Sequence, residues 1–166
     1  EIVNTDIAKT AGLSQELYDG LNSPNYYTVY PPINQLLFSL GGFFSKFGML
    51  AGIVAIRVPI IFAEFFLLKY IRRLLEALHL PHYFVLWYAL NPLVIVELSG
   101  NLHFEGMMML CVIVGIYWLM QNKWGGAAFW WAMAISMKLI PILFLPVLIK
   151  RLGIVKSVWF YIVTAL

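Results

Sequence analysis

The sequence predicts an all-α protein, a polytopic bundle of transmembrane helices with a polar segment ahead of it. Of its 166 residues, 62% are hydrophobic and 11% are charged, whereas soluble domains are about 25% charged. The mean hydropathy is +0.84. A soluble domain of this size could not cover so much apolar surface, so we expect lipid to solvate much of the chain. The small net charge of +3 gives no indication of nucleic-acid binding.

The first 32 residues are polar and contain several dipeptides that break regular structure. These are Asp19-Gly20, Ser23-Pro24 and Pro31-Pro32. We therefore expect an outer, extracytoplasmic loop over residues 1–32, with one helical turn near Gly12–Tyr18. The transmembrane region is expected over residues 33–166. It opens with a short apolar stretch, residues 33–45, which suits an interfacial or re-entrant helix begun by Pro32.

Longer apolar segments follow along the chain. The first, Phe47–Lys69, gives about 34 Å of helix, enough to cross a hydrocarbon core of about 30 Å. The amphipathic residues 71–80 extend it along the membrane surface. The later segments are Tyr83–Leu98 with a break at Asn91-Pro92, Gly106–Met120, Ala127–Ile149, and one that starts near Ile154. Residues 121–126 are expected to form the turn between the third and fourth segments. The chain has no initiator Met and stops inside an apolar run, so we expect the parent protein to continue past both ends.

The distribution of positive charge conflicts with a straight fourth span. If Lys69 and the residues after it are cytoplasmic, a continuous helix over 127–149 would place Lys150 and Arg151 outside, against the positive-inside rule. A break at Lys138–Pro141, with both halves entering from one side, removes the conflict. Broken backbone at that depth needs surrounding protein or a water-filled cavity. A lapse of the charge rule at one loop remains the alternative.

Two ionisable residues lie inside the first predicted span, where each costs about 2.5–3.5 kcal/mol. Arg57 and Glu64 are seven residues apart, about 10 Å along the helix, which is long for a direct contact. Each is therefore expected to pair with another helix. Arg57 either packs the bundle or helps to hold an anionic lipid head group.

The densest polar cluster runs from Glu97 to Glu105. A continuous helix would place Glu97, Asn101 and Glu105 on one face. Alternatively Gly100 allows a turn, with Asn101 or Ser99 capping a helix that begins near Phe104 and offers free N–H groups to an anion. An ordinary solvated loop is the third interpretation.

Lys138 lies eleven residues from either end of its segment. That is deep for a snorkelling side chain, so a buried ammonium beside a proline break is a candidate phosphate partner. Reaching an interface through local bilayer thinning is the alternative. The chain carries no phosphate-binding glycine loop, zinc-ligand spacing, nucleophile elbow or dinucleotide fingerprint, so we predict no metal and no cofactor.

Three patterns occur in order along the chain. They are Tyr30-Pro31-Pro32 ahead of an apolar helix, Asn91-Pro92-Leu93 followed by Glu97 and Gly100-Asn101-x-His103-x-Glu105, and Lys138-x-x-Pro141 ahead of an apolar run. Together they resemble the multi-spanning GT-C glycosyltransferases. The closest likeness is to bacterial polyprenol-phosphate-mannose-dependent mannosyltransferases, with the eukaryotic GPI mannosyltransferase more distant. The resemblance covers nearly all of residues 24–151.

The resemblance implies transfer of a sugar, expected to be mannose, from a polyprenyl-phosphate donor to a glycan or lipid acceptor. The reaction would take place on the non-cytoplasmic face of a bacterial inner membrane. The residues expected to bind substrate are Lys138, Arg57, Asn101, His103, Glu105, Glu97 and Tyr30. Lys138, with Arg57 as second candidate, would stabilise the leaving phosphate, and the loop through Tyr30 would exclude water.

Two departures from the family pattern bear on the mechanism. The general base of such enzymes lies on the first outer loop, so it is expected upstream of residue 1. Glu105 stands where Asp is more usual, which moves the carboxylate outward by one methylene. A secondary transporter or a flippase for lipid-linked substrates is the alternative function, since transporters also use broken helices and midplane charges. A non-catalytic assembly subunit accounts poorly for Lys138 and the 97–105 cluster.

Overall fold

The computed structural model describes residues 4–6, 9, 14–20, 26 and 30–165. Over these residues the chain consists of helices and turns without a strand, which confirms the all-α class. A short helix, α2 (Gln15–Asp19), overlaps the helical turn predicted near Gly12–Tyr18. Most of the predicted outer loop lies outside the described residues.

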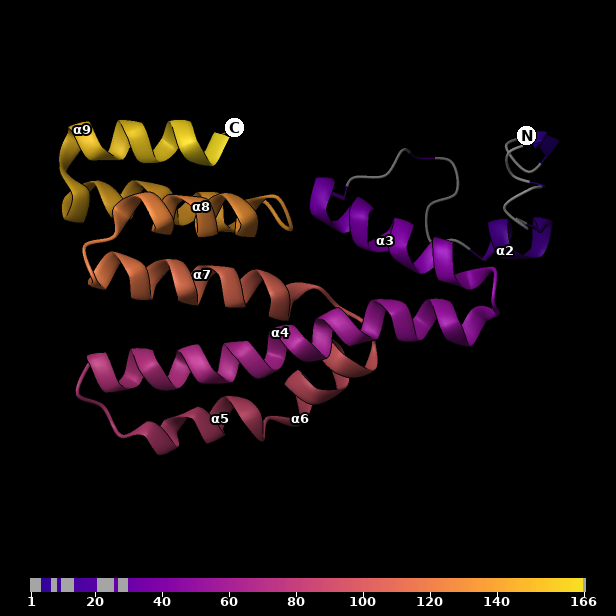
Figure 1. The fold of residues 1–166 in the computed structure, drawn as a ribbon, viewed down its shortest axis with the longest axis horizontal. Helices are drawn as coiled ribbons and strands as arrows, with labels where there is room; N and C mark the ends of the chain where they lie inside the picture. The colour runs from indigo at the N-terminus through magenta and orange to yellow at the C-terminus, as the bar shows by residue number, and fades with distance from the viewer. Residues whose placement is uncertain (1–3, 7–8, 10–13, 21–25, 27–29, 166) are drawn as a thin grey trace.

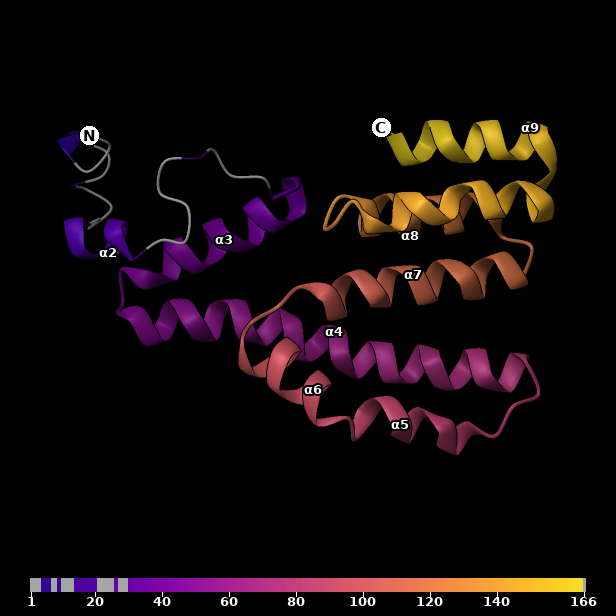
Figure 2. The same ribbon diagram turned by 180° about the vertical axis from the view of Figure 1, so that it is seen from behind.

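Helices α3 (Pro32–Ser45) and α4 (Met49–Ala77) form an antiparallel pair, seen in both views (Figures 1 and 2). Pro32 is the first residue of α3, as predicted, because proline suits the first helical turn, where its missing N–H is not needed. The 29 residues of α4 combine the predicted first span with its amphipathic extension in one helix. The turn between the two helices passes through Gly48, whose φ of 119° is accessible to glycine.

The next segment is bent where Asn91-Pro92 predicted a break. It comprises η2 (His82–Phe84), α5 (Val85–Ala89), α6 (Pro92–Val94) and the π-helical turn η3 (Ile95–Gly100). The two halves are inclined at 55° to each other. Asn91 Oδ1 accepts a hydrogen bond from the Leu93 N–H at 3.0 Å, which caps the second half, and Pro92 follows as its first residue.

Helices α7 (Glu105–Met120) and α8 (Trp124–Ile135) pack closely through paired glycines and tryptophans. A Cβ on Gly126 would lie 1.9 Å from the ring of Trp118, and one on Gly115 would lie 2.6 Å from the ring of Trp131. The turn between the helices covers only residues 121–123. The prediction that Gly125 and Gly126 belong to that turn is wrong, because both lie inside α8, where Gly126 makes room for an indole.

The predicted break around Lys138 is present. Helix α8 ends at Ile135, and the chain then turns and resumes as η4 (Ile140–Phe144) and α9 (Leu145–Ala165). Within α9 the backbone reverses at Gly153, where φ is 74° and ψ is 167°. The Tyr161 hydroxyl therefore reaches the Leu145 carbonyl and donates to it at 2.7 Å. In Figure 1 the part of α9 after Gly153 runs back above the part before it, and α9 packs against α8.

Six of the basic residues lie toward one end of the helices, which we term the cationic end. It comprises Lys69, Arg72, Arg73, Lys123, Lys150 and Arg151. Two contacts define it: Arg151 Nη2 donates to the Leu119 carbonyl at 3.3 Å, and the Tyr70 and Tyr117 rings meet with centroids 5.8 Å apart. The ends of α4 and α7 and the reversal of α9 share this side in Figures 1 and 2. Lys150 and Arg151 thus return to the side of Lys69, as the charge rule predicted for a broken helix.

Among the described helices, α4 is the one long and apolar enough to cross a membrane by itself. The bent pair of η2–α5 and α6–η3 would make a second span if it counts as one, and α7 is apolar but shorter. The full polytopic bundle goes beyond this finding and stays a prediction.

Candidate functional site

A cavity of about 390 Å³ opens where three segments meet. It lies at the ends of α7 and α8 that point away from the cationic end (Figure 1). The start of α3 forms one wall, residues 101–104 with the first residue of α7 form the second, and the turn after α8 forms the third. Its lining residues are Tyr30, Asn34, Phe38, Asn101, Leu102, His103, Phe104, Glu105, Met137 and Lys138. Five of the seven predicted substrate-binding residues are therefore in the lining.

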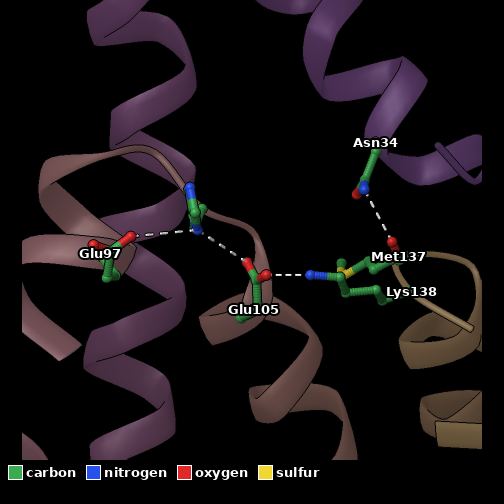
Figure 3. A network of polar contacts seen from close by, with 6 residues as sticks. Asn34, Glu97, Glu105, Met137 and Lys138 are labelled. Atoms are coloured by element: carbon green, nitrogen blue, oxygen red, sulfur yellow. Dashed lines mark hydrogen bonds and ion pairs between the residues drawn. The ribbon is translucent and has the colours of Figure 1, made fainter. Parts of the chain in front are cut away.

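Lys138 and Glu105 form an ion pair in this cavity, drawn in Figure 3. Lys138 is held by the turn that ends α8, where its N–H donates to the Ala134 carbonyl at 3.0 Å. Glu105 is the first residue of α7. The two side chains are 42% and 36% exposed, so each is paired and still reachable from the cavity. The pair joins two segments that are 33 residues apart in sequence.

His103 lies between two carboxylates. Its Nδ1 is 3.8 Å from Glu97 Oε2 and 3.8 Å from Glu105 Oε2. The loop reaches this position through hydrogen bonds from the Asn101 N–H to the Val96 carbonyl and from the His103 N–H to the Leu98 carbonyl. Between them Leu102 has a φ of 59°, in the left-handed region that costs a branched side chain about 1–2 kcal/mol. Backbone strain of this kind collects at functional sites.

An aromatic row closes another side of the cavity. The Tyr30 ring packs edge-on against Phe38, with centroids 5.1 Å apart, and Phe38 packs against Phe104 at 5.4 Å. Tyr30 thus lies at the site, where the sequence pattern placed it. Phe38 and Phe104 were not predicted, because aromatic residues in apolar segments are normally core or lipid-facing.

Arg57 and Glu97 are not among the lining residues. Arg57 Nη2 donates to the Gly100 carbonyl at 3.1 Å, so it supports the loop that carries Asn101 and His103 from behind. The partner of Arg57 is therefore the backbone of η3. Glu64 has a different partner, because it accepts a hydrogen bond from the Tyr88 hydroxyl at 3.1 Å. The prediction that Arg57 and Glu64 each pair outside α4 is confirmed. A phosphate-binding role for Arg57 stays a prediction.

Comparison with known protein families shows which family the chain belongs to. The family described as "Alpha-(1->6)-mannopyranosyltransferase, N-terminal domain" matches residues 25–152. The chain belongs to this family. No curated protein and no solved structure matches it. Family membership supports a glycosyltransferase, and it agrees with the mannosyltransferase resemblance of the motifs.

All the lining residues of the cavity lie within the stretch that matches the mannopyranosyltransferase family. The structure corrects one local detail of that stretch. Neither Asn101 nor Ser99 caps α7, because the N-cap position belongs to Phe104, which makes no side-chain cap hydrogen bond. The π-helical turn runs on to Gly100, so only residues 101–104 are left to bridge to Glu105, and Asn101 lies too early to cap.

Asn34 is a polar residue of the cavity lining that the sequence did not single out. It is 2% exposed, and its Nδ2 donates to the Met137 carbonyl at 2.9 Å, beside a bond from the Ile33 N–H to the Ser136 carbonyl at 3.2 Å. These two bonds fasten α3 to the turn that carries Lys138. Figure 3 shows the bond between Asn34 and Met137. Asn34 Oδ1 has no partner within the described residues. The sequence did offer one sign of its role, because Asn34 is an amide side chain just after Pro31-Pro32 in an otherwise apolar stretch.

Proposed function

We propose that the chain is the membrane-embedded part of a glycosyltransferase that moves mannose from a polyprenyl-phosphate donor to a glycan or lipid acceptor on the non-cytoplasmic face. The observation that carries the proposal is the Lys138–Glu105 pair, reachable from a polar cavity in a domain of a mannopyranosyltransferase family. Lys138 supplies the positive charge that a leaving phosphate requires.

The membrane placement rests on what the helices expose. Only 22% of the most apolar stretch of α4 is buried. Large apolar side chains elsewhere are equally open, with Trp87 80%, Leu143 75% and Ile154 76% exposed. Water would not tolerate so much apolar surface, whereas lipid does. Under the positive-inside rule the cationic end is cytoplasmic, so the cavity faces the other side.

The transfer is a substitution at the anomeric carbon. The bond between mannose C1 and the phosphate oxygen breaks, and the acceptor hydroxyl oxygen forms the new bond to C1. The acceptor proton passes to a general base, which we place outside the described residues, in the expected outer loop upstream of residue 1. The phosphate oxygen gains negative charge as the bond breaks, and Lys138 stabilises that charge from within the cavity.

Glu105 and His103 prepare Lys138 for this role. In the structure Glu105 neutralises Lys138, which lowers the cost of a cation at this depth. A donor phosphate replaces Glu105 as the partner of the ammonium, and the released carboxylate can turn to His103, whose Nδ1 is 3.8 Å from Glu105 Oε2 in the structure. Asn101 offers its amide to the sugar hydroxyls, whereas Asn34 holds the turn that carries Lys138. The Tyr30–Phe38–Phe104 row shields the donor from hydrolysis by water.

The test compares Lys138→Met with Lys46→Met in the parent protein. Lys46 lies at the C-terminal end of α3, over the Phe43 ring and outside the cavity. With a mannosyl-phospho-polyprenol donor, we expect Lys138→Met to lower the transfer rate by about 10²–10³-fold, the cost of removing one preorganised electrostatic contact. Lys46→Met should stay near the unmodified rate. Near-normal transfer by Lys138→Met, with normal membrane insertion, would overturn the assignment.

Lipid-linked substrate transport is the second candidate, because the helix break at Lys138 also suits a transporter. The family favours sugar transfer. The same assay separates the two functions when it is run on sealed vesicles. Transfer yields a mannosylated acceptor, whereas transport moves intact donor to the other leaflet without any product.

A further inference from the structure

We infer that the cationic end carries a second ligand site, which binds an anionic phospholipid of the adjoining leaflet. It is a separate cavity of about 280 Å³ in the groove between α4 and α8, with α7 as its floor. The inference rests on the membrane placement proposed above but not on the sugar-transfer chemistry. The groove lies away from Lys138 and shares no lining residue with the first cavity.

The groove changes in polarity along its length. On α4 it is lined by Phe66, Lys69, Tyr70 and Arg73, a spacing of three or four residues that places them on one helix face. From Phe66 to Arg73 is about 10 Å along the axis. The cations lie toward the cationic end, and the apolar Phe66 lies toward the middle of the helix. That order matches a lipid whose head group lies at the surface and whose acyl chain points inward.

The rest of the lining is apolar or aromatic. Leu110 and Val114 of α7 form the floor, and Val114 has no exposed surface. Trp130 of α8 forms the far wall. A free phosphate ion would gain nothing from these side chains, whereas an acyl chain would bury apolar area against them. Tryptophan and tyrosine are also the residues that favour the head-group level of a bilayer.

Two cations at the mouth of the groove lack an acidic partner. Arg72 Nε is bound to Glu76 Oε1 at 2.9 Å, one turn further on. In the described part of the chain, Lys69 and Arg73 form no such ion pair with a carboxylate. The Arg73 guanidinium instead lies over the Tyr70 ring, 5.2 Å from its centroid. Two uncompensated positive charges above an apolar groove are complementary to the phosphodiester and acyl chain of one anionic lipid.

Adjacent arginines provide a matched pair of variants. Arg72→Gln and Arg73→Gln remove the same charge from the same helix, but only Arg73 lines the groove. The protein, purified in neutral detergent, is titrated with phosphatidylglycerol and with phosphatidylcholine of the same acyl chains. Bound lipid is counted by native mass spectrometry. Two cations near a membrane surface correspond to about a 30-fold preference for the anionic lipid in the unmodified protein.

We expect Arg73→Gln or Lys69→Gln alone to reduce that preference about 5-fold, the double variant to abolish it, and Arg72→Gln to leave it unchanged. The two single variants check each other in case one fails to fold. An equal loss in Arg72→Gln would indicate a diffuse charge effect and overturn the inference. So would equal binding of the two lipids, or displacement of phosphatidylglycerol by millimolar inorganic phosphate. Lipid preference is read without sugar transfer, so failure here leaves the proposed function standing.

Discussion

Replacing Gly115 with alanine is expected to destabilise the protein, because α7 and α8 meet at this glycine without room for a methyl group. A Cβ on Gly115 would lie 2.6 Å from Trp131 Cδ1 and 2.7 Å from Trp131 Nε1. Carbon atoms in contact prefer separations of about 3.5–4.0 Å, so either the ring or the helix must move by about 1 Å.

The magnitude follows from how tightly Trp131 is held. The side chain is 2% exposed, and its ring packs against Phe160, which is 0% exposed, with 6.4 Å between the centroids. Overpacking costs about 1–3 kcal/mol, and a confined ring places Gly115→Ala in the upper part of that range. Alanine returns about 1 kcal/mol through its better helix propensity. The net loss of unfolding free energy is therefore about 1–2 kcal/mol.

Thermal unfolding in detergent, followed by tryptophan fluorescence, measures this loss. For a chain of this length we expect the apparent Tm of Gly115→Ala to fall by about 2–8 °C. Gly42→Ala is the control, because a Cβ at Gly42 meets nothing within 4 Å and α3 stays a helix. It should leave Tm unchanged or raise it slightly. If Gly115→Ala behaves like Gly42→Ala, the close α7–α8 packing described above is incorrect.

Two further substitutions test how the bundle is held together. Gly153→Ala should cost about 1–3 kcal/mol, because φ of 74° with ψ of 167° is almost restricted to glycine while the space around it is open. An unchanged Tm would contradict the reversal of α9 at this residue. Tyr88→Phe removes the hydroxyl that donates to the half-buried Glu64 and should cost about 1–3 kcal/mol. Tyr83→Phe, 57% exposed at the same segment, should have no effect on Tm, and an equal loss in both would refute the Tyr88–Glu64 bond.

The sequence was most informative where two independent constraints met at one residue. At Lys138 the cost of a buried cation and the positive-inside rule both favoured a break in the helix, and α8 does end three residues earlier. The same charge rule predicted that Arg151 returns to the side of Lys69, and its bond to the Leu119 carbonyl lies at that end. The break at Asn91-Pro92 was similarly overdetermined, because proline removes a backbone donor and asparagine supplies a cap.

Contacts between distant segments could not be read in this way. Asn34 is joined to Met137 across 103 residues, and no local pattern around Asn34 indicates which carbonyl it will meet. The π-helical turn before Gly100 shifted the polar cluster so that Asn101 could not cap α7. Gly126 looked like a turn residue, since glycine is common in turns. Glycine is instead needed there because the ring of Trp118, on α7, leaves no room for a Cβ.

The shortness of α8 links the ion pair to the proposed chemistry. From the cationic end, the 12 residues of α8 rise about 18 Å and the 16 residues of α7 about 24 Å. In the membrane placement proposed above, with a hydrocarbon core of about 30 Å, Lys138 and Glu105 would lie about 6–12 Å below the opposite surface. Neither charge is stable there alone, so each requires the other. If α8 crossed the whole core, Lys138 would lie inside a continuous helix, where the Met137 carbonyl would be bonded within the helix. Only the break gives Asn34 a free carbonyl to hold and leaves the ammonium reachable from the cavity where a lipid phosphate would enter.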